Sequence, residues 1–580
     1  MKRRFLLKAA SAFTLFPGMF AQAAAGVRQL ASRVRPKDAA WPAAEKWASL
    51  QQQVGGRLSK LESPFKPGAS TGFLKNTFEL GDQPALTQTS GWVDAWTSRP
   101  SAYMVAAENT QDVIAAVNFA RQNRLRLAIK GGGHSYQGTS AAPDSLLIWT
   151  RHMNSVQVHD SFVPQGCAGS VAAQPAVTLG AGAMWIDAYH AVTTRAHRYV
   201  QGGGCTTVGV AGNVQSGGFG SFSKGFGTAA GSLLEAEIVT ADGKLRRVNQ
   251  CQDPELFWGI KGGGGGSLGV VTKLVLRTHD LPEFFGFVSA VIRAQSDEAY
   301  RQLIVRFMAF YRDALCNPHW GESVQVRPSN QLHIGMVSQG LTEAEMKAAW
   351  QPFLDWVSAS PGDYAFEEGP ALGTAPARYW WDAEARKAKG SHAFNYDDRP
   401  GTPVQNAWWR DDSEQVGAYI WGYDSLWLPA SLLGDADHLA ASLVAASRHQ
   451  QVELHFNKGL AGAPEEAISR AADTATNPAV LDAFALAIVA NGGGKDDTAA
   501  QKGAQAVDAA TAILAPLAPA GGSYVSESNY FNRDWAKAFW GRNYPRLLAA
   551  KRKYDPEGLF FVHLGVGSED WSPDGFSRPG

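Results

Sequence analysis

Residues 125–135 read LRLAIKGGGHS, and this stretch decides the fold. Residues 125–130 alternate apolar and polar side chains, as a strand does. Three glycines follow at once and expose consecutive backbone N–H groups, which suit phosphate oxygens. His134 is then expected beside whatever molecule carries the phosphate. Taken alone, however, a glycine loop with a neighbouring histidine is more often a tight turn.

Two further glycine clusters follow. Residues 202–212 read GGGCTTVGVAG and are followed by GGFG at 217–220, so backbone with few bulky side chains surrounds Cys205. Taken alone, Cys205 is interpreted as a buried, inert thiol. The third cluster, 262–266, follows an expected helix and precedes an expected strand. This is the reverse of the strand–glycine–helix order of a Rossmann loop, which is therefore rejected.

The hydrophobic pattern predicts two regions that differ in the length of their helices and strands. Up to about residue 280, short strands and helices alternate. The expected helices are one capped by Asn109 or Thr110 and a short one at 253–259. The expected strands are 146–149, 176–179, 233–240 and 268–276, with a hairpin at Asp242-Gly243 into 245–248. Later segments are longer: amphipathic helices at 296–315 and 341–358, aromatic-rich strands at 417–427 and 451–456, a mobile loop at 490–505, and one helix at 535–553.

The three glycine clusters, in this order and spacing, resemble the FAD domain of the vanillyl-alcohol oxidase superfamily. Within it they are similar to the berberine-bridge-enzyme-like oxidases. Residues 544–562, with YPRLL, KRKYDP and FFV, resemble the C-terminal segment of that group. The resemblance covers about 98–280 and 520–570, whereas the middle of the chain matches only loosely.

The resemblance implies an α+β fold of two domains. These are a PCMH-type FAD-binding domain at 98–280 and a substrate domain at 281–520, with a central antiparallel sheet flanked by helices. A signal peptide at 1–23 and an extension at 24–97 precede them. A C-terminal segment at 521–580 returns to the FAD domain.

The resemblance also implies that the FAD is attached twice. The histidine of the G-G-H loop, here His134, joins the flavin 8α-methyl carbon, and Cys205, 71 residues later, joins flavin carbon 6. Both bonds lie on the dimethylbenzene end of the ring, away from the N5 atom that accepts hydride. Further FAD contacts are expected from Gly131, Gly132, Gly133, Ser135, Gly138, Val208, Gly209, Gly212, Gly217, Gly218, Val270 and Val271.

Oxidation of a C–OH group needs a base for the hydroxyl proton while hydride leaves to N5. The candidates are Tyr136, His455, Lys458, Tyr524 and Glu527. For each of them a packed or solvated polar side chain is an equally good interpretation. Many relatives carry a tyrosine fourteen residues after the flavin cysteine, but this chain has Phe219 there. A catalytic scheme that depends on that hydroxyl therefore does not transfer.

Val208 favours an oxidase. In the family the residue three after the cysteine lies near the oxygen site, where valine goes with oxidases and leucine with dehydrogenases. The expected reaction converts an alcohol or sugar hydroxyl to a carbonyl and O2 to H2O2. Two alternatives stay open: a dehydrogenase with another electron acceptor, and a flavin- or carbohydrate-binding protein without turnover.

The first residues predict export. A start with Arg3-Arg4, an apolar stretch and Ala21-Gln22-Ala23 resemble a twin-arginine signal, with an ordinary secretory signal as the alternative. The protein is then periplasmic or secreted, with no membrane span after processing. Because the net charge is zero, nothing favours nucleic acid as a partner, and we expect a small-molecule substrate and O2. The spacing of the histidines and four cysteines predicts no metal site and at most one disulfide.

Overall fold

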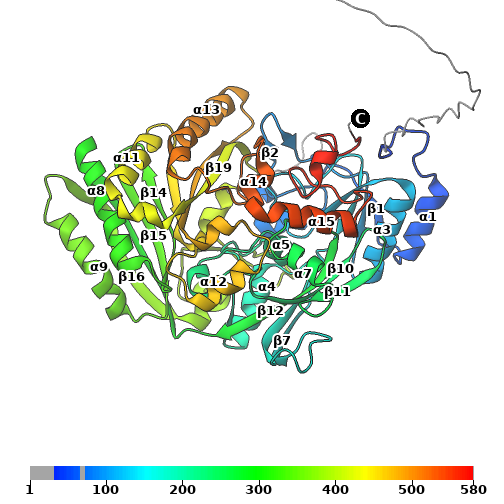
Figure 1. Cartoon of the computed structure of the whole chain (residues 1–580), viewed down its shortest axis with the longest axis horizontal. Coiled ribbons are helices and arrows are strands. Elements are labelled where there is room, and N and C mark those ends of the chain that lie inside the picture. Colours follow the sequence, from blue (N-terminus) through cyan, green and yellow to red (C-terminus); the bar gives the residue numbers. More distant parts are fainter. Residues whose placement is uncertain (1–31, 66–71, 579–580) are drawn as a thin grey trace, which may run out of the picture.

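Three large sheets and one two-stranded sheet organise the chain in a computed structural model that describes residues 32–65 and 72–578 (Figure 1). Strands and helices are mixed throughout, so the α+β class predicted from the sequence is confirmed. The predicted signal peptide at 1–23 lies outside the described residues. Within the described residues, no helix is both long and apolar enough to cross a membrane.

The first sheet has four strands in the order β1 (Leu58–Lys60), β4 (Tyr103–Ala106), β6 (Ser145–Trp149) and β5 (Arg126–Lys130). Its last three strands are parallel. The crossing helix between β4 and β5 is α3 (Thr110–Asn123), whose cap is Asn109: its side chain accepts a hydrogen bond from the backbone N–H of Asp112. The loop that begins at Gly131 leaves the end of β5, as the sequence predicted.

The second sheet is antiparallel. Its order is β11 (Leu245–Asn249), β10 (Leu233–Val239), β12 (Val270–Asp280), β8 (Gln174–Gly180) and β7 (Val156–Phe162), with β9 (Arg198–Val200) paired to β12. Short helices α4 (Trp185–Tyr189), α5 (Val210–Gln215) and α7 (Pro254–Ile260) accompany it. The loops before α5 and after α7 are the second and third glycine clusters.

The third sheet has nine strands. Its order is β16 (Tyr364–Pro376), β13 (Phe284–Ala294), β15 (Gln331–Gln339), β14 (Trp320–Arg327), β20 (Val452–His455), β21 (Ala483–Gly493), β19 (Tyr419–Pro429), β2 (Gly91–Trp92) and β3 (Trp96–Thr97). Four helices cover one face: α8 (Asp297–Phe310), α9 (Glu343–Ser358), α11 (Ala436–Ser447) and α13 (Asp497–Leu514) (Figure 1). They bury a large apolar core that includes Trp350 and Phe456.

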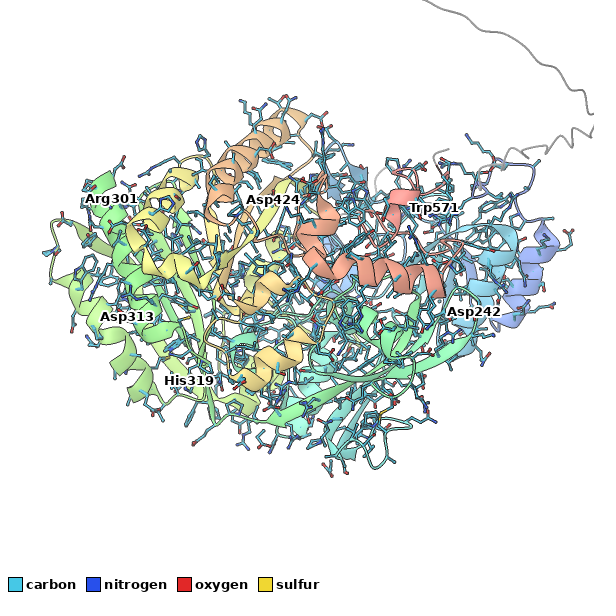
Figure 2. All side chains as sticks on the ribbon, viewed as in Figure 1. Asp242, Arg301, Asp313, His319, Asp424 and Trp571 are labelled. Atoms are coloured by element: carbon cyan, nitrogen blue, oxygen red, sulfur yellow. A yellow bond between two sulfur atoms is a disulfide. The ribbon has the colours of Figure 1, made fainter. Side chains whose placement is uncertain are left out.

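Charged side chains on the outer surface tie the covering helices together. Arg301, near the outer end of α8 in Figure 2, bonds to Glu298 of its own helix at 2.9 Å. It also reaches Asp437 of α11 at 2.8 Å. Because these groups are partly or largely exposed, each ion pair contributes little stability, and the apolar core carries most of the helix packing.

The two terminal segments join different sheets. β2 pairs with β19 in parallel, at Gly91 with Tyr419 and Trp92 with Ile420, so residues before the FAD-like region extend the third sheet. At the other end, α14 (Trp535–Trp540) and α15 (Tyr544–Tyr554) follow the third sheet, and α15 packs on α7 beside the second one. The predicted domain boundaries stay a prediction.

Two predictions from the sequence were wrong. The expected mobile loop at 490–505 is mostly regular, because β21 continues to Gly493 and α13 begins at Asp497, capped by the side chain of Asp496. The expected single helix at 535–553 is two helices. Gly541 has φ +50°, which breaks the helical path between them.

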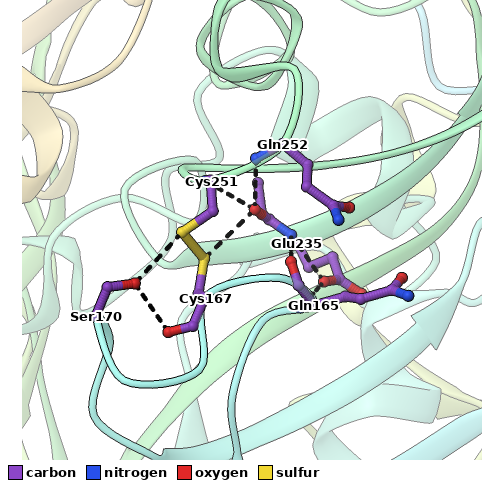
Figure 3. The surroundings of a disulfide bond; sticks show 7 residues. Gln165, Cys167, Ser170, Glu235, Cys251 and Gln252 are labelled. Atoms are coloured by element: carbon purple, nitrogen blue, oxygen red, sulfur yellow. Dashed lines mark hydrogen bonds between the residues drawn. A yellow bond between two sulfur atoms is a disulfide. The ribbon is translucent and has the colours of Figure 1, made fainter.

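One disulfide joins Cys167, in the loop after β7, to Cys251, just after β11 (Figure 3). Asn249 lies buried behind it: its side-chain oxygen accepts hydrogen bonds from the N–H groups of Cys251 and Gln252. The same amide donates to the backbone oxygen of Gln165 and to Glu235. The bond therefore fastens the Cys167 loop to the edge of the second sheet.

Removing this disulfide should destabilise the protein. The two cysteines are 84 residues apart, and a crosslink over such a loop stabilises by about 2–4 kcal/mol, chiefly by restricting the unfolded chain. We expect the double variant Cys167→Ser/Cys251→Ser to lose that much in free energy of unfolding, measured by denaturant titration. Cys316→Ser, at a free cysteine, is the control. Equal losses in both variants would contradict the prediction.

Candidate active site

A cavity of about 1440 Å³ lies where the three sheets meet. Its walls come from the loops after β5, before α5 and after α7, from the uncovered face of the third sheet, and from the turn at 524–527. Small-molecule sites usually measure roughly 300–1,000 Å³. The cavity therefore has room for a large cofactor and a second molecule beside it.

The first two glycine loops touch backbone to backbone. A Cβ atom added to Gly132 would lie 2.7 Å from the nitrogen of Gly209 and 2.8 Å from the backbone oxygen of Thr207. A Cβ added to Gly209 would lie 2.8 Å from the nitrogen of Gly132. Real Cβ atoms do not come so close, so both positions require glycine for this contact. The contact brings His134 and Cys205, distant in the sequence, into one cavity wall.

His134 and Cys205 are both half-buried and carry different protonation chemistry. The His134 Nε2 atom lies 3.0 Å from the hydroxyl oxygen of Thr207. Burial lowers the pKa of His134 to about 4, so its imidazole is neutral and nucleophilic near pH 7. Burial, followed by the charge of Asp412, raises the pKa of the Cys205 thiol well above its usual value. Cys205 therefore holds its proton, which it donates to Asp412 at 3.2 Å.

Unpaired polar atoms mark the cavity as a site for a polar ligand. Buried polar groups are nearly always hydrogen-bonded, yet seven side chains in the wall have a buried oxygen without a partner among the described residues. Asp412 and Asn457 are two of them, and the other five are Thr77, Gln88, Thr89, Gln137 and Ser267. The glycine cluster at 264–266 adds backbone without side chains to the same wall. These groups fit the ribityl, phosphate and ring oxygens of FAD, and His134 and Cys205 lie beside them.

The structure separates the predicted FAD contacts into two sets. The cavity wall contains Gly131, Gly132, Gly133, Ser135, Val208, Gly209, Gly212 and Val271. It does not contain Gly138, Gly217, Gly218 and Val270.

These four residues have close protein neighbours, and their contact with FAD stays a prediction. Gly138 lies against the ring of Trp96, where an added Cβ would be 2.5 Å away, and Gly218 lies as close to Ala229. Gly217 and Gly218 have positive φ angles, so they serve the turn. Val270 is fully buried in the core beneath the first sheet.

All five catalytic candidates line the cavity. Lys458 forms an ion pair with Glu527, with Nζ–Oε distances of 2.5 and 2.7 Å. Ser425 of β19 positions the turn that carries Glu527, because its hydroxyl donates to the Glu527 backbone oxygen and accepts from the Tyr524 N–H. The sequence indicated Lys458 and Glu527 as separate candidates, whereas in the structure they form one ion pair.

His455 belongs to a second pair of polar side chains, which the sequence analysis missed. Its Nε2 atom lies 3.2 Å from Oε1 of Glu453, two residues earlier on β20 and on the same face. Ser323 donates to the same oxygen at 2.7 Å. Burial raises the pKa of Glu453, but the charge and hydrogen bond of His455 and the Ser323 hydroxyl bring it down to about 2. The sequence did carry a signal for this pair: residues two apart in a strand lie on the same face, and 451–456 was expected to be a strand.

The tyrosines are less suited to take a proton. Burial raises the pKa of Tyr136 and of Tyr524 well above that of a free phenol. Tyr136 donates to Gln415 at 2.5 Å, and its ring lies 5.2 Å from that of Tyr423. Tyr524 is 3 % exposed and packs edge-on against Phe219 at 5.0 Å.

Comparisons with known proteins agree with this geometry. The FAD binding domain family matches residues 101–249, and the berberine and berberine-like family matches 521–567. An FAD-linked oxidoreductase of Trichophyton verrucosum is 30% identical over 586 residues, which cover 93% of this chain and 91% of that protein. The chain is an FAD-linked oxidoreductase of the berberine-bridge-enzyme-like family.

Two solved structures share the fold of this oxidoreductase. The VAO-type flavoprotein MtVAO615 of Myceliophthora thermophila has a TM-score of 0.76 at 25% identity, over 93% of this chain and 98% of that one. A glucooligosaccharide oxidase of Acremonium strictum, described with a 6-S-cysteinyl, 8α-N1-histidyl FAD, has a TM-score of 0.65 at 18% identity, over 90% and 99%. The second likeness concerns the fold alone.

Substitution of Gly132 should weaken FAD binding by this oxidoreductase. The Cβ of Gly132→Ala meets backbone atoms that cannot turn away, and such overpacking costs about 1–3 kcal/mol. We expect the purified variant to carry less flavin per protein than wild type, because the displaced loops no longer hold His134 and Cys205 in one cavity wall. The flavin-to-protein absorbance ratio measures it. Gly362→Ala, where an added Cβ meets nothing within 4 Å, is the control, and a normal ratio in both contradicts the prediction.

Proposed function

We propose that the protein is an exported flavoprotein oxidase whose FAD is attached to both His134 and Cys205. It oxidises an alcohol or sugar hydroxyl to a carbonyl and reduces O2 to H2O2. The observation that carries the proposal is the contact between the Gly132 and Gly209 loops, which puts both attachment residues in one cavity wall. The doubly attached FAD named for the Acremonium strictum oxidase supports the same arrangement.

Bound FAD supplies the acceptor for a hydride and the means to pass its electrons to oxygen. The protein must then take the hydroxyl proton, and among the candidates His455 is best placed. Glu453 holds the Nε2–H of the imidazole, which leaves Nδ1 with its lone pair. That Nδ1 atom is buried, has no protein partner among the described residues, and belongs to a side chain in the cavity wall. An acceptor atom that is left unpaired in this way suits general-base catalysis.

The other candidate residues bind and orient the substrate. The Lys458–Glu527 pair places a donor and a carboxylate within the wall, and both are already engaged with each other. The rings of Tyr136 and Tyr423 form an aromatic surface that suits the flat face of a sugar or another cyclic alcohol. Val208 lines the cavity three residues after Cys205, which favours O2 as the acceptor over a dehydrogenase reaction.

Export is supported by the disulfide. Structural disulfides persist in oxidising compartments and are rare in the cytosol. The Cys167–Cys251 bond therefore agrees with a periplasmic or secreted location, which residues 1–23 predict by their twin-arginine-like pattern. The proposed partners are a small-molecule substrate and O2.

Double attachment has a direct test. After acid precipitation, the yellow colour should stay with the wild-type protein, with His134→Ala and with Cys205→Ala, because one bond suffices. The double variant should release its flavin into the supernatant, where absorbance measures it. Wild-type colour that washes out entirely overturns the attachment.

Steady peroxide production under air tests the oxidase reaction, with an active alcohol or oligosaccharide chosen from a substrate panel. Dye reduction without peroxide would support the dehydrogenase.

The base assignment predicts two different effects. His455→Asn should lower the rate of flavin reduction by about 10²–10⁴-fold while the flavin stays attached, because the proton acceptor is lost. Glu453→Gln should lower that rate by a smaller factor, because the acceptor stays but the carboxylate that holds the Nε2–H is lost. Stopped-flow absorbance measures both. Equal rates in Glu453→Gln and wild type would contradict the pairing.

A further inference from the structure

Asp412 is the residue that contacts the Cys205 thiol. Its Oδ1 atom accepts the thiol hydrogen at 3.2 Å, and it lies in a short 3-10 turn, Arg410–Glu414, between β18 (Ala407–Trp409) and β19. No family motif covers this part of the chain, and the candidate residues chosen from the sequence did not include it. The thiolate, and not the thiol, is the nucleophile, so a cysteine needs a base that takes its proton. Asp412 is placed to be that base for Cys205.

The contact is built by a network on both sides. The indole of Trp409 donates to the backbone oxygen of Gly204 at 3.1 Å, just before Cys205. The hydroxyl of Thr206, just after it, donates to the backbone oxygen of Ala407 at 2.7 Å. On the other side, the indole of Trp408 donates to the hydroxyl of Ser413, next to Asp412. The cysteine loop is therefore fastened to the Asp412 segment by one hydrogen bond on each side of Cys205, and the Trp408–Ser413 bond braces the Asp412 turn itself.

Asp412 is also available as a base. Its second oxygen, Oδ2, is buried without a partner, and no lysine or arginine forms an ion pair with it among the described residues. Burial raises the pKa of Asp412 to about 6, although the hydrogen bond from Cys205 lowers it. Most of the group is thus ionised near pH 7, and it binds a proton more readily than a free carboxyl does. Lys458 and Glu527, the other charged groups that influence the thiol, are paired with each other.

We propose that Asp412 is the base that makes the bond between Cys205 and the flavin, which rests on the proposed double attachment. The thiol gives its proton to Asp412 and the sulfur lone pair forms the bond to flavin carbon 6. The hydrogen on that carbon leaves as a proton, and the ring system gains two electrons and takes up two protons. Dioxygen then removes these electrons and protons and leaves as hydrogen peroxide. Asp412 thereby acts in the maturation of the enzyme, separately from substrate turnover.

The test compares Asp412→Asn with wild type as purified holoenzyme. The asparagine keeps the shape and the Oδ1 acceptor but removes the base. Each protein is precipitated, alkylated with iodoacetamide and digested, and mass spectrometry counts flavin-bearing and alkylated Cys205 peptides. We expect the Cys205 bond to fall at least tenfold in Asp412→Asn, with the His134 bond unchanged in the same sample. Asp412→Glu should restore it, and Asp398→Asn, exposed and outside the cavity wall, should match wild type.

A pH experiment separates a base from a residue that merely holds the loop. Incubated in air at alkaline pH, Asp412→Asn should slowly gain the Cys205 bond, because the thiol then ionises without help. A misplaced loop would gain nothing, and that result overturns the proposal. Full Cys205 attachment in freshly purified Asp412→Asn overturns it too, while leaving the double attachment intact. A wild-type protein without the Cys205 bond overturns both. If Asp412→Asn does not fold, loss of the bond in a folded Asp412→Glu overturns the proposal.

Discussion

The close approach of two backbones at Gly132 and Gly209 is the constraint on which the rest of the site depends. Both loops leave regular elements, β5 and the residues before α5, and neither tolerates a side chain at the point of contact. Because the contact involves main-chain atoms, its geometry does not vary with side-chain conformation. It therefore fixes the distance between the residues on either side, and these are the ones that the cofactor chemistry needs.

The remaining walls come from segments that are remote in the sequence. β20 supplies Glu453 and His455, the turn at 524–527 supplies Glu527, and the turn before β19 supplies Asp412. Each is fastened by polar contacts to a neighbouring element: Ser323 to Glu453, Ser425 to the Glu527 turn, and Trp409 to the cysteine loop. A site assembled in this way holds its proton-accepting side chains in fixed positions.

Local sequence patterns predicted the elements well and the contacts between elements poorly. Strand alternation at 125–130 and the Asn109 cap placed β5 and α3 within a residue or two. The glycine clusters indicated the cavity, but the pattern alone did not reveal the protein neighbours and positive φ angles of Gly138, Gly217 and Gly218. Asp412 had no motif, and its meaning arises only from a hydrogen bond across 207 positions of chain. The helix break at Gly541 required a positive φ angle, which composition does not reveal.

The short strands β2 and β3 have a mechanical consequence. They extend the nine-stranded sheet through Tyr419 and Ile420, while the indole of Trp96 donates to the backbone oxygen of Tyr136 in the loop that carries His134. The same few residues are thus hydrogen-bonded to both halves of the molecule. A hinge motion that separated the two halves would have to break the Trp96–Tyr136 hydrogen bond and the pairing of β2 with β19. Residues 91–97 therefore link the loop that carries His134 to the sheet that carries His455, and they help to hold the two walls of the cavity at a fixed separation.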